Sequence, residues 1–230
     1  MPRPSKRERF DALVAAGLRV FAERGFNKAQ MADVAAVMGV SQGTLYNYVE
    51  SKEALFSLCL DRLLAPDAPM PELPVHMPSQ DDVLARLRAR LEEVWALPRL
   101  EKALATRRPA DVRAELAEII EEGYDAIGSR RLAFDAIERS AREMPEIAEL
   151  YFVEIRRRQI ARYTAYIEAR IRSKQFRPQL DPPTATRLVL ESVTYFARHR
   201  LGDLDSAMLD DDTVRRTVID MMSAALLARP

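Results

Sequence analysis

Apolar residues along this chain recur every three or four positions, and no stretch alternates apolar and polar residues as a half-buried strand would. Only 7 of the 230 residues are glycine, which disfavours loop-rich β folds and Rossmann-like folds. The hydrophobic share of 48% is enough to bury a sizeable core. We therefore expect an all-α fold.

The charges of the chain balance, with 35 lysines and arginines against 35 aspartates and glutamates. Zero net charge argues against a uniformly basic nucleic-acid binder, so any such site must be a local patch. The single cysteine, Cys59, excludes an internal disulfide framework and fits a reducing compartment. No apolar run approaches the ~18 residues that span a membrane. These features predict a cytoplasmic chain with no membrane partner.

Helical spacing divides the first 64 residues into four expected helices. The first begins near Ser5 and ends at Gly25, a left-handed cap, and it buries Phe10, Leu13, Val14, Gly17, Val20 and Phe21. Two short helices then flank a turn at Gly39, the second of them running from Ser41 to Tyr48. Ser51 is placed to cap a fourth helix whose inward residues are Leu55, Leu58, Cys59 and Leu63.

A proline-rich segment predicts the domain boundary, because five of the 14 prolines fall between Pro66 and Pro78. We place one domain at 1–64 and a second at 65–230. In the second, Ser79 and Asp82 resemble a helix cap, and a helix continues to near Pro98. A long helix, roughly 45–50 Å, is expected from Pro145 to Pro178, with its inward line at Ile147, Tyr151, Ile155, Ile160, Tyr163, Ile167 and Ile171.

Two further helices complete the second domain. Asp181 before two prolines is placed to cap one of them, and the last runs from Thr213 to Leu227. This pair carries more apolar surface than one bundle needs, which predicts a two-fold homodimer with a four-helix interface. The expected interface residues are Leu188, Val189, Val193, Phe196, Val214, Val218, Met221, Met222 and Leu226.

The segment from Met31 to Tyr48 has the organisation of a helix-turn-helix, in which a second helix presents its N-terminal residues to the major groove. Gly39 supplies the turn, and Val40 and Leu45 are placed to pack the two helices together. Six residues, mostly with uncharged hydrogen-bonding groups, remain to face outward: Ser41, Gln42, Gly43, Thr44, Asn47 and Tyr48. Lys28 and Lys52 are placed to flank them at phosphates, and the basic arm Arg3 to Arg9 is either a solvated tail or a further contact.

The sequence GFNKAQMADVAAVMGVSQGTLYNYVESKEALF resembles the DNA-binding signature of TetR/AcrR-type transcriptional regulators, in register over about the first 60 residues. The resemblance implies an N-terminal three-helix helix-turn-helix domain, joined by a connecting helix to a C-terminal helical domain that binds an effector and dimerises. It implies that Lys52 holds a phosphate and that the residues facing double-stranded DNA are Gln42, Gly43, Thr44, Tyr46, Asn47 and Tyr48.

Three positions depart from the family pattern. Ala29 and Gln30 stand where a phosphate-binding Thr or Ser is usual, and Gln30 can replace it in part. Gln42 replaces a common basic residue, which weakens the electrostatic part of binding, and Val49 replaces a usual aromatic. Binding to DNA is still expected.

The resemblance implies a ligand-responsive transcriptional regulator, a repressor that a small, mostly apolar molecule releases from a pseudo-palindromic operator. The alternative is a non-inducible or architectural DNA-binding dimer without an effector. Candidate pocket residues are aromatics of the C-terminal part, each of which can equally be core: Trp95, Tyr124, Phe134, Tyr151, Phe152, Tyr163, Tyr195 and Phe196. Catalysis finds little support, since His76 and His199 lack partners at ligand or acid–base spacing, and we expect no cofactor and no metal.

Overall fold

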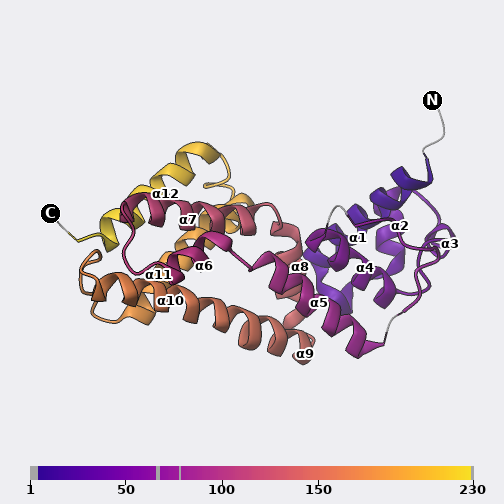
Figure 1. Cartoon of the computed structure of the whole chain (residues 1–230). Helices are drawn as coiled ribbons and strands as arrows, with labels where there is room; N and C mark the ends of the chain where they lie inside the picture. Colours follow the sequence, from indigo (N-terminus) through magenta and orange to yellow (C-terminus); the bar gives the residue numbers. More distant parts are fainter. Residues whose placement is uncertain (1–4, 66–67, 78, 229–230) are drawn as a thin grey trace. The chain divides into compact units, whose positions relative to one another are not determined.

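The computed structural model describes residues 5–65, 68–77 and 79–228, and helices joined by turns and irregular segments make up these ranges (Figure 1). They contain no β-strand, only two isolated bridges, between Val49 and Val75 and between Phe176 and Leu227. The expected all-α class is confirmed. Arg3 of the basic arm and two of the boundary prolines, Pro66 and Pro78, lie outside the described residues.

The helices form two compact units that are not continuous in sequence. The N-terminal unit comprises Met1–Glu93 with Leu132–Ile155, and the C-terminal unit comprises Val94–Arg131 with Arg156–Pro230. The compact units thus differ from the division at residue 64, because later helices pack with the first four. The functional division into residues 1–64 and 65–230 stays a prediction.

The N-terminal unit contains eight helical elements within its described residues: α1 (Lys6–Lys28), α2 (Met31–Met38), α3 (Gln42–Leu45), α4 (Lys52–Leu64), α5 (Gln80–Val94), α8 (Arg131–Ala141), α9 (Pro145–Ala148) and the π-helical η1 (Glu149–Arg156). Local caps fix several of their starts. Ser5 Oγ accepts from Glu8 N at 3.1 Å while the Glu8 carboxylate accepts from Ser5 N at 2.6 Å, a capping box. Gly25 has a φ of 77°, so it interrupts α1 as expected, although helix resumes to Lys28.

Helices α1 and α4 pack closely at Gly17 of α1. A Cβ at this position would lie 2.7 Å from the Cys59 Sγ atom of α4, so only glycine permits this approach. Cys59 is fully buried, and burial raises the pKa of its thiol, as the expected core role requires. Beside this contact, the Phe56 ring lies 5.0 Å from that of Phe21 and 5.1 Å from that of Phe26.

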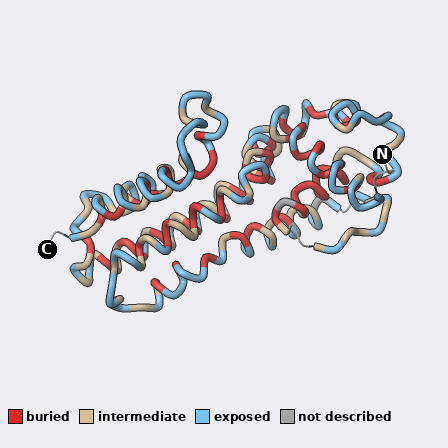
Figure 2. The backbone as a smooth tube through the Cα atoms, turned by 90° about the horizontal axis from the view of Figure 1, so that it is seen from above, coloured by how far each residue is buried: buried red, intermediate tan, exposed pale blue. Residues whose placement is uncertain are grey.

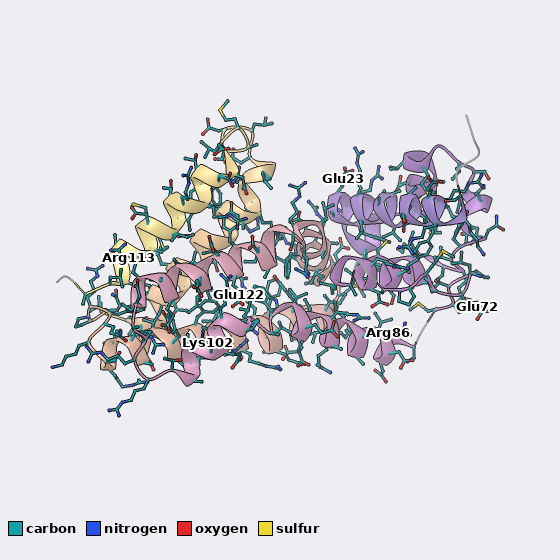
Figure 3. The ribbon with its side chains drawn as sticks, turned by 45° about the horizontal axis from the view of Figure 1, so that its top comes forward. Glu23, Glu72, Arg86, Lys102, Arg113 and Glu122 are labelled. Atoms are coloured by element: carbon teal, nitrogen blue, oxygen red, sulfur yellow. The ribbon has the colours of Figure 1, made fainter. Side chains whose placement is uncertain are left out.

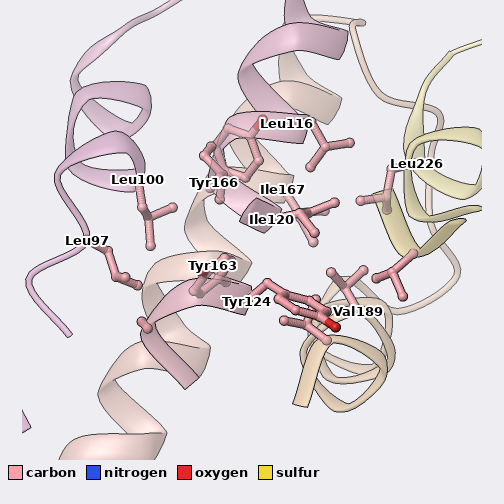
Figure 4. Packing of buried hydrophobic residues seen from close by; sticks show 14 of the residues in the cluster. Leu97, Leu100, Leu116, Ile120, Tyr124, Tyr163, Tyr166, Ile167, Val189 and Leu226 are labelled. Carbon is pink, nitrogen blue, oxygen red and sulfur yellow. The ribbon is translucent and has the colours of Figure 1, made fainter. Parts of the chain in front are cut away.

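The C-terminal unit contains six elements in its described part: α6 (Pro98–Ala105), α7 (Val112–Gly128), α10 (Arg157–Arg172), α11 (Pro182–Ala197), the 3-10 turn η2 (His199–Gly202) and α12 (Asp211–Leu226). Aspartate side chains cap three of these helices, Asp111 for α7, Asp181 for α11 and Asp210 for α12. Helix α7 packs against α6, α11 and α12, and α10 packs against α6 and α11. Their inward faces form one apolar core (Figure 4), and Figure 2 shows buried residues following one side of each helix.

The long helix expected from Pro145 to Pro178 is present only in part. It begins at Pro145 but changes to a π-helix over Glu149–Arg156 and ends at Arg172. Lys174 then adopts a φ of 60°, and Phe176 turns into the bridge with Leu227. Of the expected inward line, Ile160 and Ile171 are only half-buried, and Gln159 is buried instead.

A buried arginine of α10 ties three helices of the C-terminal unit together. The Arg170 side chain is 1% exposed, and its guanidinium donates to both carboxylate oxygens of Glu115 on α7, at 2.7 and 2.9 Å. The same group donates to the carbonyl oxygens of Ala103 and Thr106, at 2.7 and 2.9 Å, at the end of α6. The Tyr166 hydroxyl donates to Glu115 at 3.1 Å. The Arg170 guanidinium and the Glu115 carboxylate therefore both have hydrogen-bond partners within this cluster.

We predict that Arg170→Met lowers the free energy of unfolding of the C-terminal unit by about 3 kcal/mol, because Glu115 loses its buried partner. Urea denaturation followed by the fluorescence of Trp95, the single tryptophan, measures this. Arg172→Met is the control, since this exposed neighbour should shift stability by less than about 0.5 kcal/mol. Equal losses in both variants would contradict the assigned role of Arg170.

Candidate nucleic-acid interface

The helix-turn-helix of the N-terminal unit is built by α2, a three-residue turn and α3. Gly39 has a φ of 66°, a left-handed conformation that ends α2, and Val40 N donates to Ala35 O at 3.0 Å across the turn. Met31, Val34 and Ala35 of α2 and Leu45 of α3 are buried. The turn therefore holds α3 against α2 with its N-terminal residues outward.

The outward residues of α3 carry hydrogen-bonding groups and no charge. Ser41, Gln42 and Gly43 are exposed, and the Ser41 and Thr44 hydroxyl oxygens lie 2.9 Å apart. Gln42 Nε2 donates to the hydroxyl of Tyr46 at 3.4 Å, and the Tyr46 side chain is 45% exposed. A Cβ added at Gly43 would meet nothing closer than 3.9 Å, so the protein's own packing does not require glycine there.

Three expectations for this motif are wrong. Tyr48 does not face outward, since it is only 8% exposed, and Val40 does not pack the two helices together, since it is 36% exposed. Helix α3 also ends at Leu45 instead of Tyr48. The cause is the bridge between Val49 and Val75, in which Val75 N donates to Tyr48 O at 2.7 Å, so the chain turns inward directly after α3.

The basic and capping residues around α3 differ in their exposure to solvent and in their hydrogen bonds within the unit. Lys28 is exposed, whereas Lys52 is half-buried and donates from Nζ to Phe26 O at 3.0 Å, with Nζ 4.4 Å from the Phe26 ring centroid. Gln30 is exposed at the start of α2, and its backbone N–H donates to the Asp33 carboxylate at 3.1 Å. The structure thus leaves Lys28, Gln30 and Asn47 open to solvent and engages Lys52 within the unit.

The proline-rich segment makes a second contact, with Glu50 directly after the helix-turn-helix, and the sequence analysis did not predict it. Glu50 N donates to Val75 O at 3.1 Å, and the Glu50 carboxylate accepts from Met77 N and contacts His76 Nδ1 at 2.7 Å. The Met77 N–H, and to a smaller extent His76, hold the pKa of Glu50 below its usual value. Glu50 and His76 are 26 residues apart, so no local pattern in the sequence indicates their contact.

A third unanticipated contact links α8 to the segment after the kink in α1. Glu143 Oε2 accepts from Asn27 N at 2.8 Å, and a Cβ at Gly25 would lie 3.1 Å from both the Arg139 side chain and this carboxylate. Glycine at position 25 therefore allows the segment after α8 to approach the start of the helix-turn-helix.

The predicted pocket aromatics separate into two groups of three and a remaining pair, Tyr195 and Phe196. Phe134, Tyr151 and Phe152 lie together in the N-terminal unit, with ring centroids 6.1 and 5.0 Å apart, and the Tyr151 hydroxyl donates to Glu138 at 3.1 Å. In the C-terminal unit, Tyr124 and Tyr163 are buried in the core and Trp95 is half-buried.

The remaining members of the set are nearer the surface. Tyr195 is 37% exposed and donates to Asp203 at 2.9 Å, and the neighbouring Phe196 is half-buried. A hollow of about 590 Å³ reaches Tyr124, whose hydroxyl donates to Asp211 at 2.9 Å. Burial and this contact raise the pKa of Tyr124.

The predicted interface residues are only partly available for a second protomer. Val189, Val193, Val214, Val218 and Leu226 are buried in the core of their own unit, so the expectation that they stay exposed is wrong. Helices α11 and α12 pack against each other and against α7, which covers these faces. Leu188 and Met221 remain 64% and 59% exposed, and Phe196 and Met222 are half-buried.

Comparison with known proteins gives the helix-turn-helix a family. Residues 13–59 match the bacterial regulatory proteins of the tetR family. The uncharacterised HTH-type transcriptional regulator YvdT of Bacillus subtilis (strain 168) is 34% identical over 56 residues, which is 24% of this chain and 29% of YvdT. Residues 13–59 therefore resemble the DNA-binding domain of TetR-family regulators, and the chain spans less than a third of the length of the curated relative that it matches.

Solved structures extend the likeness to nearly the whole chain at the level of fold alone. The ketosteroid transcriptional regulator KstR2 of Mycobacterium tuberculosis is 17% identical with a TM-score of 0.58, covering 96% of both chains. A protein from Saccharomonospora viridis in complex with choline is also 17% identical, with a TM-score of 0.56, covering 97% of this chain and all of the other.

Neither a membrane-spanning helix nor a metal-binding cluster is found among the described residues. Their helices include none that is both long enough and apolar enough to cross a membrane. They likewise hold no group of three or more His, Cys, Asp or Glu side chains that could ligate a metal ion.

We predict that the Glu50 carboxyl titrates below the ordinary glutamate pKa of about 4.3. A lowered folded-state pKa means that its contribution to stability is present above the unfolded-state pKa and is lost as the pH falls through the folded value. A carboxyl NMR titration measures this. His76→Ala should leave most of the shift, because the Met77 N–H is the larger cause. Full return of the pKa to 4.3 in this variant would contradict the geometry.

Proposed function

We propose that the chain is a DNA-binding transcriptional regulator whose residues 41–47 read the major groove. The observation that carries the proposal is an exposed, uncharged row of donors and acceptors at the start of α3, held outward by the turn at Gly39. Gln42 suits the edge of adenine, and Thr44 suits a phosphate or a thymine methyl. Gly43, which the fold does not require to be glycine, allows close approach of the DNA backbone.

The phosphate contacts of this proposal rest on residues with different availability. Lys28 has its ammonium group free for a phosphate, and Gln30 and Tyr46 are exposed on either side of the motif. Lys52 already donates one hydrogen bond to Phe26 O and is half-buried, so its contribution to affinity is expected to be smaller than that of Lys28. Tyr48 serves mainly as packing, because its side chain is buried.

We infer that the regulator acts as a homodimer on a pseudo-palindromic operator. The proposed interface uses the exposed remainder of the predicted residues, Leu188 on α11 and Met221 on α12, flanked by Phe196 and Met222. Two such faces related by a two-fold axis form a four-helix interface. Each protomer then presents one α3 to one half-site.

We also propose that a small, mostly apolar effector lowers the affinity for DNA, so that the protein is a repressor released by its ligand. The fold-level similarity to a protein that was solved in complex with choline favours a ligand-binding helical domain. Glu143 supplies one mechanical link, since a shift of α8 would reach the α1–α2 segment through Asn27 N. The alternative, a non-inducible DNA-binding dimer, requires only a filled C-terminal core, and the three buried tyrosines of that core, Tyr124, Tyr163 and Tyr166, fit it.

We predict that Gln42→Ala and Thr44→Ala change the preferred base sequence, because they remove direct contacts to bases. Lys28→Ala should instead weaken binding to all sequences alike and reduce the salt slope of log affinity by about one unit. Selection of bound sites from random duplex DNA, followed by titrations at several salt concentrations, measures both effects. Arg19→Ala, an exposed residue of α1 paired with Glu23, is the control.

The selected sites also test the symmetry of the proposal. They are expected to contain two inverted half-sites, and the free protein should sediment as a dimer at micromolar concentration. A monomer that retains operator affinity would exclude the dimer. An unchanged sequence preference in both Gln42→Ala and Thr44→Ala would exclude the reading role of α3.

We predict that an effector found by thermal shift among apolar small molecules lowers operator affinity by roughly 5–150-fold, the range of typical allosteric coupling. Each compound that raises the melting temperature is tested for release of the selected operator in a fluorescence titration. Compounds that stabilise the protein yet leave operator affinity unchanged would favour the non-inducible alternative.

A further inference from the structure

A cluster of arginines in the C-terminal unit surrounds a hollow beside the α6–α7 loop and the end of α10. The hollow has a volume of about 600 Å³. Four arginines and two hydroxyl residues line it, and no carboxylate does: Thr106, Arg107, Arg108, Arg170, Arg172 and Ser173. No residue of the helix-turn-helix takes part, and none of the predicted pocket aromatics lines this hollow.

The four arginines differ in how far their charge is compensated. Arg170 is buried and fully engaged with Glu115, as described above. Arg172 has a single carboxylate within reach, that of Glu168, at 3.6 Å. Arg107 and Arg108 are exposed neighbours in the loop, and neither has a hydrogen bond or ion pair to another described residue. Three guanidinium groups around the hollow therefore keep donors for an external anion.

The hydroxyl groups of the same hollow are already committed as donors. Thr106 Oγ1 donates to Lys102 O at 2.7 Å, and Ser173 Oγ donates to Arg170 O at 3.1 Å. The available donors are thus the guanidinium groups, whose planar fork matches a phosphate oxygen pair. Leu104 and Ala169 add an apolar wall against which an uncharged part of a ligand can rest.

We propose that this hollow binds a small phosphorylated molecule, with its phosphate between Arg107, Arg108 and Arg172. Placing these like charges side by side costs free energy through mutual repulsion, and a bound dianion offsets that cost. A concave site of this volume fits a small molecule, whereas a nucleic-acid backbone needs an extended basic surface.

The test uses pyrophosphate as the probe, added to the full chain at constant ionic strength. Isothermal titration calorimetry gives the affinity, and the arginine Nε–H signals in NMR report which side chains respond. The expected result is saturable binding that moves the signals of Arg107, Arg108 and Arg172. The double variant Arg107→Gln/Arg108→Gln should bind about tenfold more weakly.

The matched control is Arg113→Gln on α7, an exposed arginine outside the lining of the hollow (Figure 3), which should bind as the wild type does. Unchanged melting temperatures verify that each variant is folded. The proposal is overturned by absence of saturable binding, by equal affinities in the double variant and the control, or by sulfate binding as tightly as pyrophosphate. Stronger perturbation of these three arginines by a duplex lacking the operator than by pyrophosphate would assign the surface to nucleic acid instead.

Discussion

Helix α4 is buried on all sides along its middle, and the position of the turn between α3 and α4 depends on this burial. Every residue from Ala54 to Leu60 is buried, so α4 has no solvent face along its middle. Helix α4 begins directly after the turn that follows α3, where Ser51 Oγ accepts from Ala54 N at 3.0 Å. Its close contact with α1 at Gly17 leaves no room for sliding. A displacement of α4 must therefore move α1 and the turn after α3 together with it.

Local interactions explain why much of the fold could be predicted from the sequence. Ser5, Ser51 and Asp181 cap helices through backbone N–H groups three residues away, so their roles depend on a few neighbouring residues. The turn at Gly39 likewise needs only its own positive φ. By contrast, the inward turn of Tyr48 depends on Val75, and no local pattern reveals a contact at that separation.

Five of the predicted interface residues are buried within their own unit for a different physical reason. Periodicity finds an apolar face of a helix but does not say what covers it. Val189 and Val214 fit an interface by pattern, yet helix α7 supplies the covering surface within the same unit. The residues that remain exposed, Leu188 and Met221, carry the same pattern signal. Distinguishing the two sets requires the packing of three helices, which is set by contacts far apart in the chain.

The π-helical turns of η1 change how the segment from Pro145 to Arg172 presents its side chains. An α-helix rotates by 100° per residue, so each step of four positions drifts by about 40° around the axis. Buried residues here keep a four-residue spacing over five steps, at Ile147, Tyr151, Ile155, Gln159, Tyr163 and Ile167. In a regular α-helix that line would wind by about 200°, onto the opposite face.

A π-helix has wider turns than an α-helix and rotates less per residue. The line of buried residues therefore drifts backward around the axis over η1, and this offsets its forward drift over α10. The angular compensation also explains why Gln159 is buried in place of Ile160. Removing one residue from η1 would return the segment to ordinary α-helical winding, in which side chains four positions apart no longer stay on one face of the helix.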